Sequence, residues 1–270
     1  GTVVYNGDQG QRLIQVSASR RIAVSDAGVD VFQRILTGNG TFATGASGTN
    51  TGTAVIDVGV VLDPVKWNVA GNSKDYTVRF SVNGGATTYD IIDNVSGNSL
   101  LTGVAPAAPP YPRTYASGSS IAFSQVGSPL FDFGAQVAVA GTPQNGDSFT
   151  IKTSTNQDVF KTIDNLASLL ESSSGGAALT NGLVGAQRNL DNAMDSILTI
   201  RASAGSRLKE LDSAKSGEEE LALQYSQTLS RLQDLDYAKA SSELIQQQAN
   251  LEAAQKSFAK IAGMSLFDYL

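Results

Sequence analysis

The chain has 270 residues, of which 41% are hydrophobic, and a net charge of −6, with neither cysteine nor histidine. The missing residue types exclude disulfides, thiolate nucleophiles, histidine-ligated metals and imidazole-based catalytic triads. The dispersed negative charge argues against nucleic acid as a partner, because basic patches are needed to neutralise phosphates, and no run of residues approaches the roughly 18 apolar residues of a membrane span.

Residues 1–35 are predicted to form short strands and a helical turn. Residues 11–16 and 21–24 alternate as strands do, and segments rich in Asn, Asp, Ser and Gly bound them. Residues 29–36 fit one or two turns of helix. Because the chain opens Gly1-Thr2-Val3 as a strand would inside a protein, we expect a missing upstream portion.

Residues 36–153 are rich in Gly, Thr, Ser, Asn and Val and predict an outer β domain. Alternating polar and apolar residues predict half-buried strands, and Asn83-Gly84-Gly85 is a strong hairpin signal between two of them. Four of the seven prolines lie in residues 105–112, which we expect to form an ordered loop. Regular short strands of this kind indicate a β-sandwich module. The expected strands are residues 54–62, 76–82, 87–92, 120–123, 136–140 and 148–151.

The hydrophobic period changes to that of a helix after Thr155. One helix is predicted over residues 156–171 and a second over 183–211, followed by a turn at 212–217. Ser216 and Glu219 fit a capping box that would begin a third helix running to about residue 262. That helix would be about 67 Å long, whereas a globule of this size is only about 48 Å across. Its apolar stripe must therefore be buried against another copy or another protein.

The apolar stripe of this last helix has two phases. Leu221, Tyr225 and Leu232 belong to the first, and Tyr237 begins the second after a step of five residues, which rotates the seam. This pattern predicts one helix in two packing environments, with a heptad seam suited to a helical partner. The predicted assembly interface consists of Tyr237, Leu244, Leu251, Phe258, Ile261, Leu266, Phe267, Tyr269 and Leu270.

Several stretches resemble the bacterial flagellin superfamily, and within it the flagellar hook-associated protein 3 family of hook–filament junction proteins. The C-terminal tail Gly263-Met264-Ser265-Leu266-Phe267-Asp268-Tyr269-Leu270 follows a helix that carries Leu235-Asp236-Tyr237-Ala238. Residues 5–12, 25–32 and 141–149 also match, so the resemblance covers residues 1–35 and 141–270. Filament flagellin is similar through the helices, but it usually ends in a Leu-Leu-Arg type tail.

The resemblance implies an α+β fold, with a long antiparallel helical rod and an inserted β-sandwich-like outer domain. Residues 1–35 and 154–235 would form the rod, and residues 236–270 would be the inner helix used for polymerisation. The family's N-terminal helical arm has no counterpart here, so the chain is expected to be a fragment. The implied partners are further copies, a neighbouring hook-associated protein, filament flagellin and an export chaperone bound through the C-terminal helix. The implied location is extracellular, at the hook–filament junction.

Other functions have weaker support from the sequence. Ser257 with Lys260 and Ser206 with Lys209 fit the S-x-x-K motif of acyl-transferring enzymes, but the accompanying motifs are missing. Asp90 and Asp93 are expected to be solvated surface groups rather than a catalytic pair. We therefore expect no enzyme activity, cofactor or metal. Filament flagellin and a secreted adhesin that binds its ligand through the β domain remain the alternatives.

Overall fold

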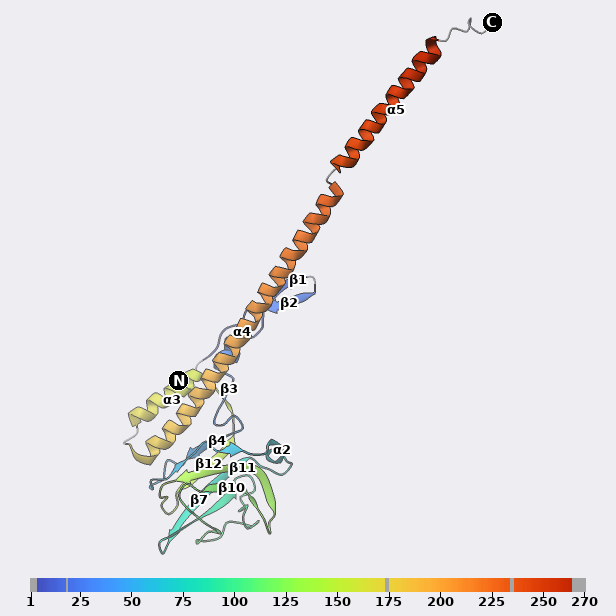
Figure 1. Ribbon diagram of the computed structural model, residues 1–270. Coiled ribbons are helices and arrows are strands. Elements are labelled where there is room, and N and C mark those ends of the chain that lie inside the picture. Colours follow the sequence, from blue (N-terminus) through green and yellow to red (C-terminus); the bar gives the residue numbers. More distant parts are fainter. Residues whose placement is uncertain (1–3, 18, 173–174, 234–235, 264–270) are drawn as a thin grey trace. The chain divides into compact units, whose positions relative to one another are not determined.

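The computed structural model describes residues 4–17, 19–172, 175–233 and 236–263 (Figure 1). The chain forms two compact units, Gly1–Leu208 and Lys209–Leu270. The helices are α1 (Gly28–Phe32), α2 (Pro64–Trp67), α3 (Val159–Ser172), α4 (Gly176–Gln233) and α5 (Tyr237–Gly263). The strands are β1 (Leu13–Ser17), β2 (Arg20–Ala23), β3 (Ile35–Leu36), β4 (Phe42–Ala46), β5 (Val55–Ile56), β6 (Val60–Val61), β7 (Asp75–Asn83), β8 (Ala86–Asp93), β9 (Arg113–Thr114), β10 (Ser120–Gln125), β11 (Phe131–Ala140), β12 (Ser148–Thr153) and β13 (Asn156–Gln157). This composition confirms the predicted α+β fold class.

The N-terminal segment forms a short hairpin, one turn of helix and a strand. β1 and β2 pair antiparallel, with Ile14 opposite Ile22, which confirms both strands predicted there. The helix expected over residues 29–36 ends at Phe32 instead. It ends there because Ile35 and Leu36 pair with β13, where the chain returns from the β module.

Two antiparallel sheets make up the β module. One has the strand order β4-β12-β7-β8-β9, and the other has the order β10-β11-β5 with β6 also paired to β11. Their inner faces meet in one core, because the ring of Tyr76 on β7 lies 5.2 Å from that of Phe123 on β10. This packing of two sheets confirms the predicted β-sandwich-like module.

The hairpin predicted at Asn83-Gly84-Gly85 joins β7 to β8. Asn83 pairs with Ala86 across a two-residue turn. Both turn glycines have positive φ, +57° at Gly84 and +84° at Gly85, as this tight turn requires. The alternating residues of the two strands are thereby held in register, with Val78 opposite Ile91 and Phe80 opposite Tyr89 on the core side.

The single tryptophan lies in the core of the β module. Trp67 ends α2 and is 1% exposed, and its ring lies 5.2 Å from that of Phe42. The carboxylate of Asp63 accepts hydrogen bonds from the backbone N–H groups of Val65 and Lys66, which fixes the start of α2. Because Trp67 is the only tryptophan in the chain, its fluorescence reports on this core alone.

Asp90 is buried, so the expectation that it is a solvated surface group was wrong. Its side chain on β8 is 1% exposed. Oδ1 accepts hydrogen bonds from the hydroxyl of Ser99, at 2.6 Å, and from the N–H of Ile91, at 2.8 Å. Oδ2 has no hydrogen-bond partner among the described residues. The sequence pattern did not show this because the covering residue, Ser99, belongs to the following loop.

Replacing Asp90 by asparagine is expected to stabilise the β module at neutral pH. Burial raises the pKa of Asp90 above its ordinary value of 3.8, although the hydrogen bonds from Ser99 and Ile91 and the charge of Arg79 act in the opposite direction. A raised pKa means that the folded state holds the proton more tightly. The stabilisation from this group is therefore complete below 3.8 and is lost as pH rises through the raised value.

Asp90→Asn keeps the Oδ1 acceptor and removes the buried charge. We expect it to raise the free energy of unfolding by about 1 kcal/mol at pH 7 and to flatten its decline with pH. Urea unfolding followed by Trp67 fluorescence, repeated across this pH range, measures both changes. An unchanged pH dependence in the variant would contradict the assignment.

The helical region lacks the turn that was predicted between its second and third helices. α3 lies near the predicted first helix, and Gly176 begins α4. α4 continues without interruption to Gln233, so the turn predicted at residues 212–217 and the capping box of Ser216 and Glu219 were wrong. No proline interrupts this stretch, and Gly217 inside a helix costs only about 1 kcal/mol. The helix therefore continues, and its 58 residues span about 87 Å.

A helix boundary occurs where the sequence shows the change of seam. α4 ends at Gln233 and α5 begins at Tyr237, so the prediction of one helix through this point was wrong. Oδ1 of Asp236 accepts hydrogen bonds from the N–H groups of Ala238 and Lys239, both at 3.1 Å. This N-cap satisfies the free N–H groups of the first turn of α5 and starts it as a separate helix.

Candidate assembly surface

α5 carries an apolar seam that no described residue covers. Tyr237, Leu244, Leu251 and Phe258 follow one another at intervals of seven, and Ile261 comes three residues later. Their exposed fractions are 82%, 58%, 59%, 73% and 71%. No residue of α5 is buried in the described structure. Side chains of this size at heptad spacing are the knobs of helix-to-helix packing.

Four further residues were predicted to belong to the interface. Leu266, Phe267, Tyr269 and Leu270 lie outside the described residues. The interface prediction for these four therefore stays a prediction.

One side of α5, next to the seam, is polar. Lys239, Glu243, Gln246 and Asn250 are all exposed there. This face carries both signs of charge and uncharged amides, whereas helices that lie on membranes favour a strongly basic polar face. Among the described residues, no helix is long and apolar enough to cross a membrane.

The second half of α4 presents apolar side chains as well. Tyr225 is 71% exposed and Leu232 is 80% exposed, in the phase that the sequence predicts. Sequence reasoning missed Leu223, Leu229 and Ile245, which are 58%, 53% and 63% exposed. They lie off the predicted seams, Leu223 on the opposite side of α4, and a search for a single heptad phase passes over such positions. Exposed apolar side chains in this number indicate a surface that another protein covers.

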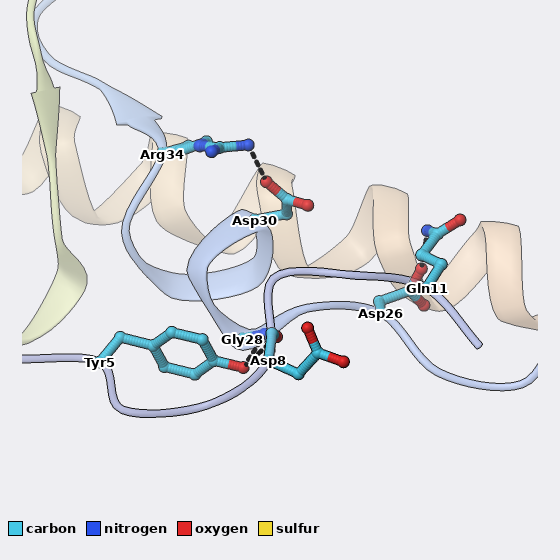
Figure 2. A network of polar contacts seen from close by, with 7 residues as sticks. All are labelled: Tyr5, Asp8, Gln11, Asp26, Gly28, Asp30 and Arg34. Carbon is cyan, nitrogen blue, oxygen red and sulfur yellow. Dashed lines mark hydrogen bonds and ion pairs between the residues drawn. The ribbon is translucent and has the colours of Figure 1, made fainter.

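The first two family-like stretches, residues 5–12 and 25–32, fold against each other (Figure 2). The hydroxyl of Tyr5 donates to the carbonyl of Asp8 and accepts from the N–H of Gly28, both at 3.1 Å. Nε2 of Gln11 donates to Oδ1 of Asp26 at 3.0 Å. These contacts fix the chain on either side of the β1–β2 hairpin.

Arg207 attaches this N-terminal segment to α4. Its guanidinium forms an ion pair with Asp26 and donates a hydrogen bond to the carbonyl of Ala23 at 3.0 Å. The two paired side chains are only 18% and 21% exposed, so water screens the pair less than an open surface pair. The hairpin is thereby held beside α4 (Figure 1).

The third family-like stretch, residues 141–149, is organised around Asp147. This carboxylate is 2% exposed. Oδ1 accepts from the N–H of Thr51 at 2.8 Å, and Oδ2 accepts from the N–H groups of Gly52, at 3.0 Å, and Gln144, at 2.8 Å. A Cβ at Gly52 would lie 2.5 Å from Oδ2, so glycine is required there. Asp147 thus joins the loop before β12 to the loop after β4.

A row of asparagines on α4 docks the helix on the β module. Asn181 accepts from the N–H of Ile56 at 2.9 Å and donates to the carbonyl of Ala54 at 3.0 Å. Two further turns along the helix, Asn189 accepts from the N–H of Gly38 at 2.9 Å, and Asn192 donates to its carbonyl at 2.9 Å. These side-chain amides satisfy backbone groups at β5 and in the segment between β3 and β4.

The charged side chains offer no ready metal centre. Among the described residues, no group of three or more carboxylates could hold a metal ion. The arrangement therefore consists of a packed β module, a helix fixed to it, and uncovered apolar helical surface.

The chain is similar to known proteins in both sequence and structure. No model of a protein family matches the chain. Flagellar hook-associated protein 3 of Escherichia coli (strain K12) is 40% identical over 80 residues, which are 30% of this chain and 25% of that protein. Hook-associated protein 3 from Legionella pneumophila superposes with a TM-score of 0.72 at 29% identity, covering 87% of this chain and 68% of that one. The flagellar junction protein FlgL from Legionella pneumophila gives 0.68 at 30% identity, covering 84% and 67%.

A β module combined with long helices of this kind is the fold of the flagellar hook-associated proteins. Within that class the chain belongs to the flagellar hook-associated protein 3 family, since it is 30% identical to FlgL and covers two thirds of its solved chain. The match to the curated relative spans a quarter of that relative's length.

Proposed function

We propose that the chain is a structural component of the bacterial flagellum that connects the hook to the filament by polymerising through its helices. The exposed heptad seam of α5 carries this proposal, because Tyr237, Leu244, Leu251 and Phe258 present apolar surface that a helical neighbour would bury. A solved relative is named as a flagellar junction protein, which supports the location. The action is mechanical, with no chemical step.

The proposed partners follow from the proposed position between the hook and the filament of the flagellum. They are further copies of the chain, a neighbouring hook-associated protein and filament flagellin. The C-terminal helix would bind an export chaperone before secretion, since an uncovered apolar seam needs shielding until assembly. Residues 236–270 would form the inner polymerising part, residues 154–235 the rod together with residues 1–35, and residues 36–153 the outer β domain.

The position of the protein in whole flagella tests this function. A short epitope inserted between Gly84 and Gly85 would sit at an exposed turn, where no atom lies within 4 Å of a built Cβ on either glycine. Immunogold labelling is expected to mark one narrow band at the base of each filament. Labelling along the whole filament would instead identify a filament flagellin. Labelling away from flagella, together with saturable binding to a glycan array, would identify an adhesin.

A further inference from the structure

One part of the β module carries almost no charge. Residues 94–131 contain Arg113 as their only charged residue, whereas the chain's average of 16% charged residues would give about six. The guanidinium of Arg113 is itself engaged, since it donates to the carbonyls of Ala122, at 3.3 Å, and Ser124, at 2.7 Å. Depletion of charged residues is the compositional mark of the core of a protein–protein interface.

Two uncharged loops of this stretch meet at the surface of the module. One is residues 94–104, which follow β8, and the other is residues 126–130, which join β10 to β11. Nε2 of Gln125 donates to the carbonyls of Leu101 and Pro129, both at 3.1 Å, and so ties the loops together. These two loops form what we call the charge-free surface.

The charge-free surface has a cavity and a projecting side chain. The cavity has a volume of about 210 Å³, and Leu100 and Gly103 line it from the first loop and Pro129 from the second. A protein cavity of about 150 Å³ can hold benzene, so this one has room for an aliphatic side chain. Val126 is 100% exposed and Leu130 is 77% exposed at the two ends of the second loop. One surface therefore supplies both an apolar projection and a cavity that can receive one.

The charge-free surface lies on the side of the module away from α4. In the five-stranded sheet, β4 and β9 are the two edge strands. The β4 edge faces α4, because Thr44 on β4 and Asn181 on α4 line the same groove. The charge-free surface adjoins the β9 edge, since Gln125, which ties its loops together, also accepts from the guanidinium of Arg113 on β9 at 3.4 Å. The helix that carries the module therefore leaves this surface open.

A second copy of the chain fits this surface best. Each copy has a net charge of −6, so copies repel one another, and a charge-free contact avoids that repulsion. Self-contact also needs a self-complementary surface, and this one has both the projection and the cavity. Two loops bury far less than the roughly 1,200 Å² of a stable interface. Copies that α5 already holds side by side nevertheless reach effective concentrations of about millimolar, at which a weak contact forms.

We propose that Val126 of one copy enters the cavity of a neighbouring copy, so that the β modules touch one another within the polymer. This contact rests on the proposed function, because α5 must first bring the copies together. It adds to the strength of the assembly and fixes neighbouring β modules relative to each other.

Site-directed cross-linking tests the contact, because the chain has no cysteine of its own. Val126→Cys is placed in one preparation of the 270-residue chain, which carries a heavy-isotope label. A second, unlabelled preparation carries Ser96→Cys or Asn98→Cys, because both residues line the cavity. The two are mixed, assembled and oxidised. We expect a disulfide-linked dimer of one labelled and one unlabelled copy, since a disulfide needs Cα atoms within about 7 Å.

The matched control is Thr49→Cys in the second preparation. Thr49 is also exposed, but it follows β4 at the opposite edge of the sheet. If the mixture assembles and neither cavity position links more than Thr49→Cys, the contact between β modules is wrong while the proposed function stands. If the parent chain does not assemble at any concentration, the proposed function fails and the contact fails with it.

A charge on the projecting side chain supplies an independent test. Val126→Asp is expected to raise the concentration for half-maximal assembly about tenfold, because the contact would bury the carboxylate. Thr49→Asp adds the same charge at the opposite edge and should leave assembly unchanged. Because Val126 is fully exposed, the urea midpoint of Trp67 fluorescence should not move in either variant, which separates lost contact from misfolding.

Two results would overturn the proposal. One is an assembly curve of Val126→Asp that matches that of Thr49→Asp. The other is a parent chain that binds a glycan array saturably and a Val126→Asp variant that loses this binding but assembles normally. That second result would assign the charge-free surface to a foreign ligand and not to a second copy.

Discussion

Replacing Asp147 by alanine is expected to lower the free energy of unfolding of the β module by about 4 kcal/mol. Its carboxylate is 2% exposed and accepts from the N–H groups of Thr51, Gly52 and Gln144. Alanine would remove the acceptor of all three donors. Thr51 and Gln144 are exposed residues, so water replaces part of this bonding, but each hydrogen bond to a charged group contributes about 1.5–3 kcal/mol.

Asparagine at the same position provides the sharper test. Each Asp147 oxygen accepts from at least one N–H, so either orientation of an asparagine amide points its NH₂ group at a donor. Asp147→Asn should therefore destabilise nearly as much as Asp147→Ala. The opposite result is expected for Asp90→Asn, because only one oxygen of Asp90 is used. Urea midpoints from Trp67 fluorescence compare the variants. An Asp147→Asn protein as stable as the parent would refute this account.

These two aspartates show where sequence reasoning ends. The family-like stretch at residues 141–149 marks Asp147 as notable, but its three donors come from two loops almost 100 residues apart. Strand alternation assigns Asp90 to the outer face of β8. The loop that covers it has no regular hydrophobic pattern from which its position could be predicted. Alternation and turn residues predicted the strands of the β module. They could not predict which polar side chains the loops would bury.

For the helices, periodicity predicted the apolar faces but not the points at which a helix begins or ends. Periodicity predicted the α5 seam and the step between Leu232 and Tyr237, because the spacing of apolar residues determines which of them share a helix face. It predicted a turn at residues 212–217 that does not form, since small and polar residues there are tolerated by a helix without proline. It also missed the cap at Asp236, which divides one predicted helix into two. A helix boundary of this kind depends on one capping side chain and not on the spacing of apolar residues.

Deleting residues 236–270 is expected to abolish self-assembly and leave the rest of the chain folded. The deleted segment contains all of α5, and no residue of α5 is buried in the described structure. The β module therefore loses no packing, and the urea midpoint of Trp67 fluorescence should stay unchanged. Sedimentation velocity should show a monomer at every concentration at which the parent chain assembles. A truncated chain that polymerises like the parent would show that α5 is not the assembly surface.

Point variants separate the seam from the mere presence of the helix. Leu251→Asp and Phe258→Asp each place a charge at a position that assembly would bury, which costs roughly 3 kcal/mol or more. Each should therefore raise the concentration for assembly about a hundredfold. Ala249→Asp adds the same charge on the opposite face, where Ala249 is exposed, and is the matched control. If Ala249→Asp impairs assembly as strongly as Phe258→Asp, net charge and not burial of the seam controls association. A selective loss in the two seam variants instead requires that Leu251 and Phe258 lie against a neighbour.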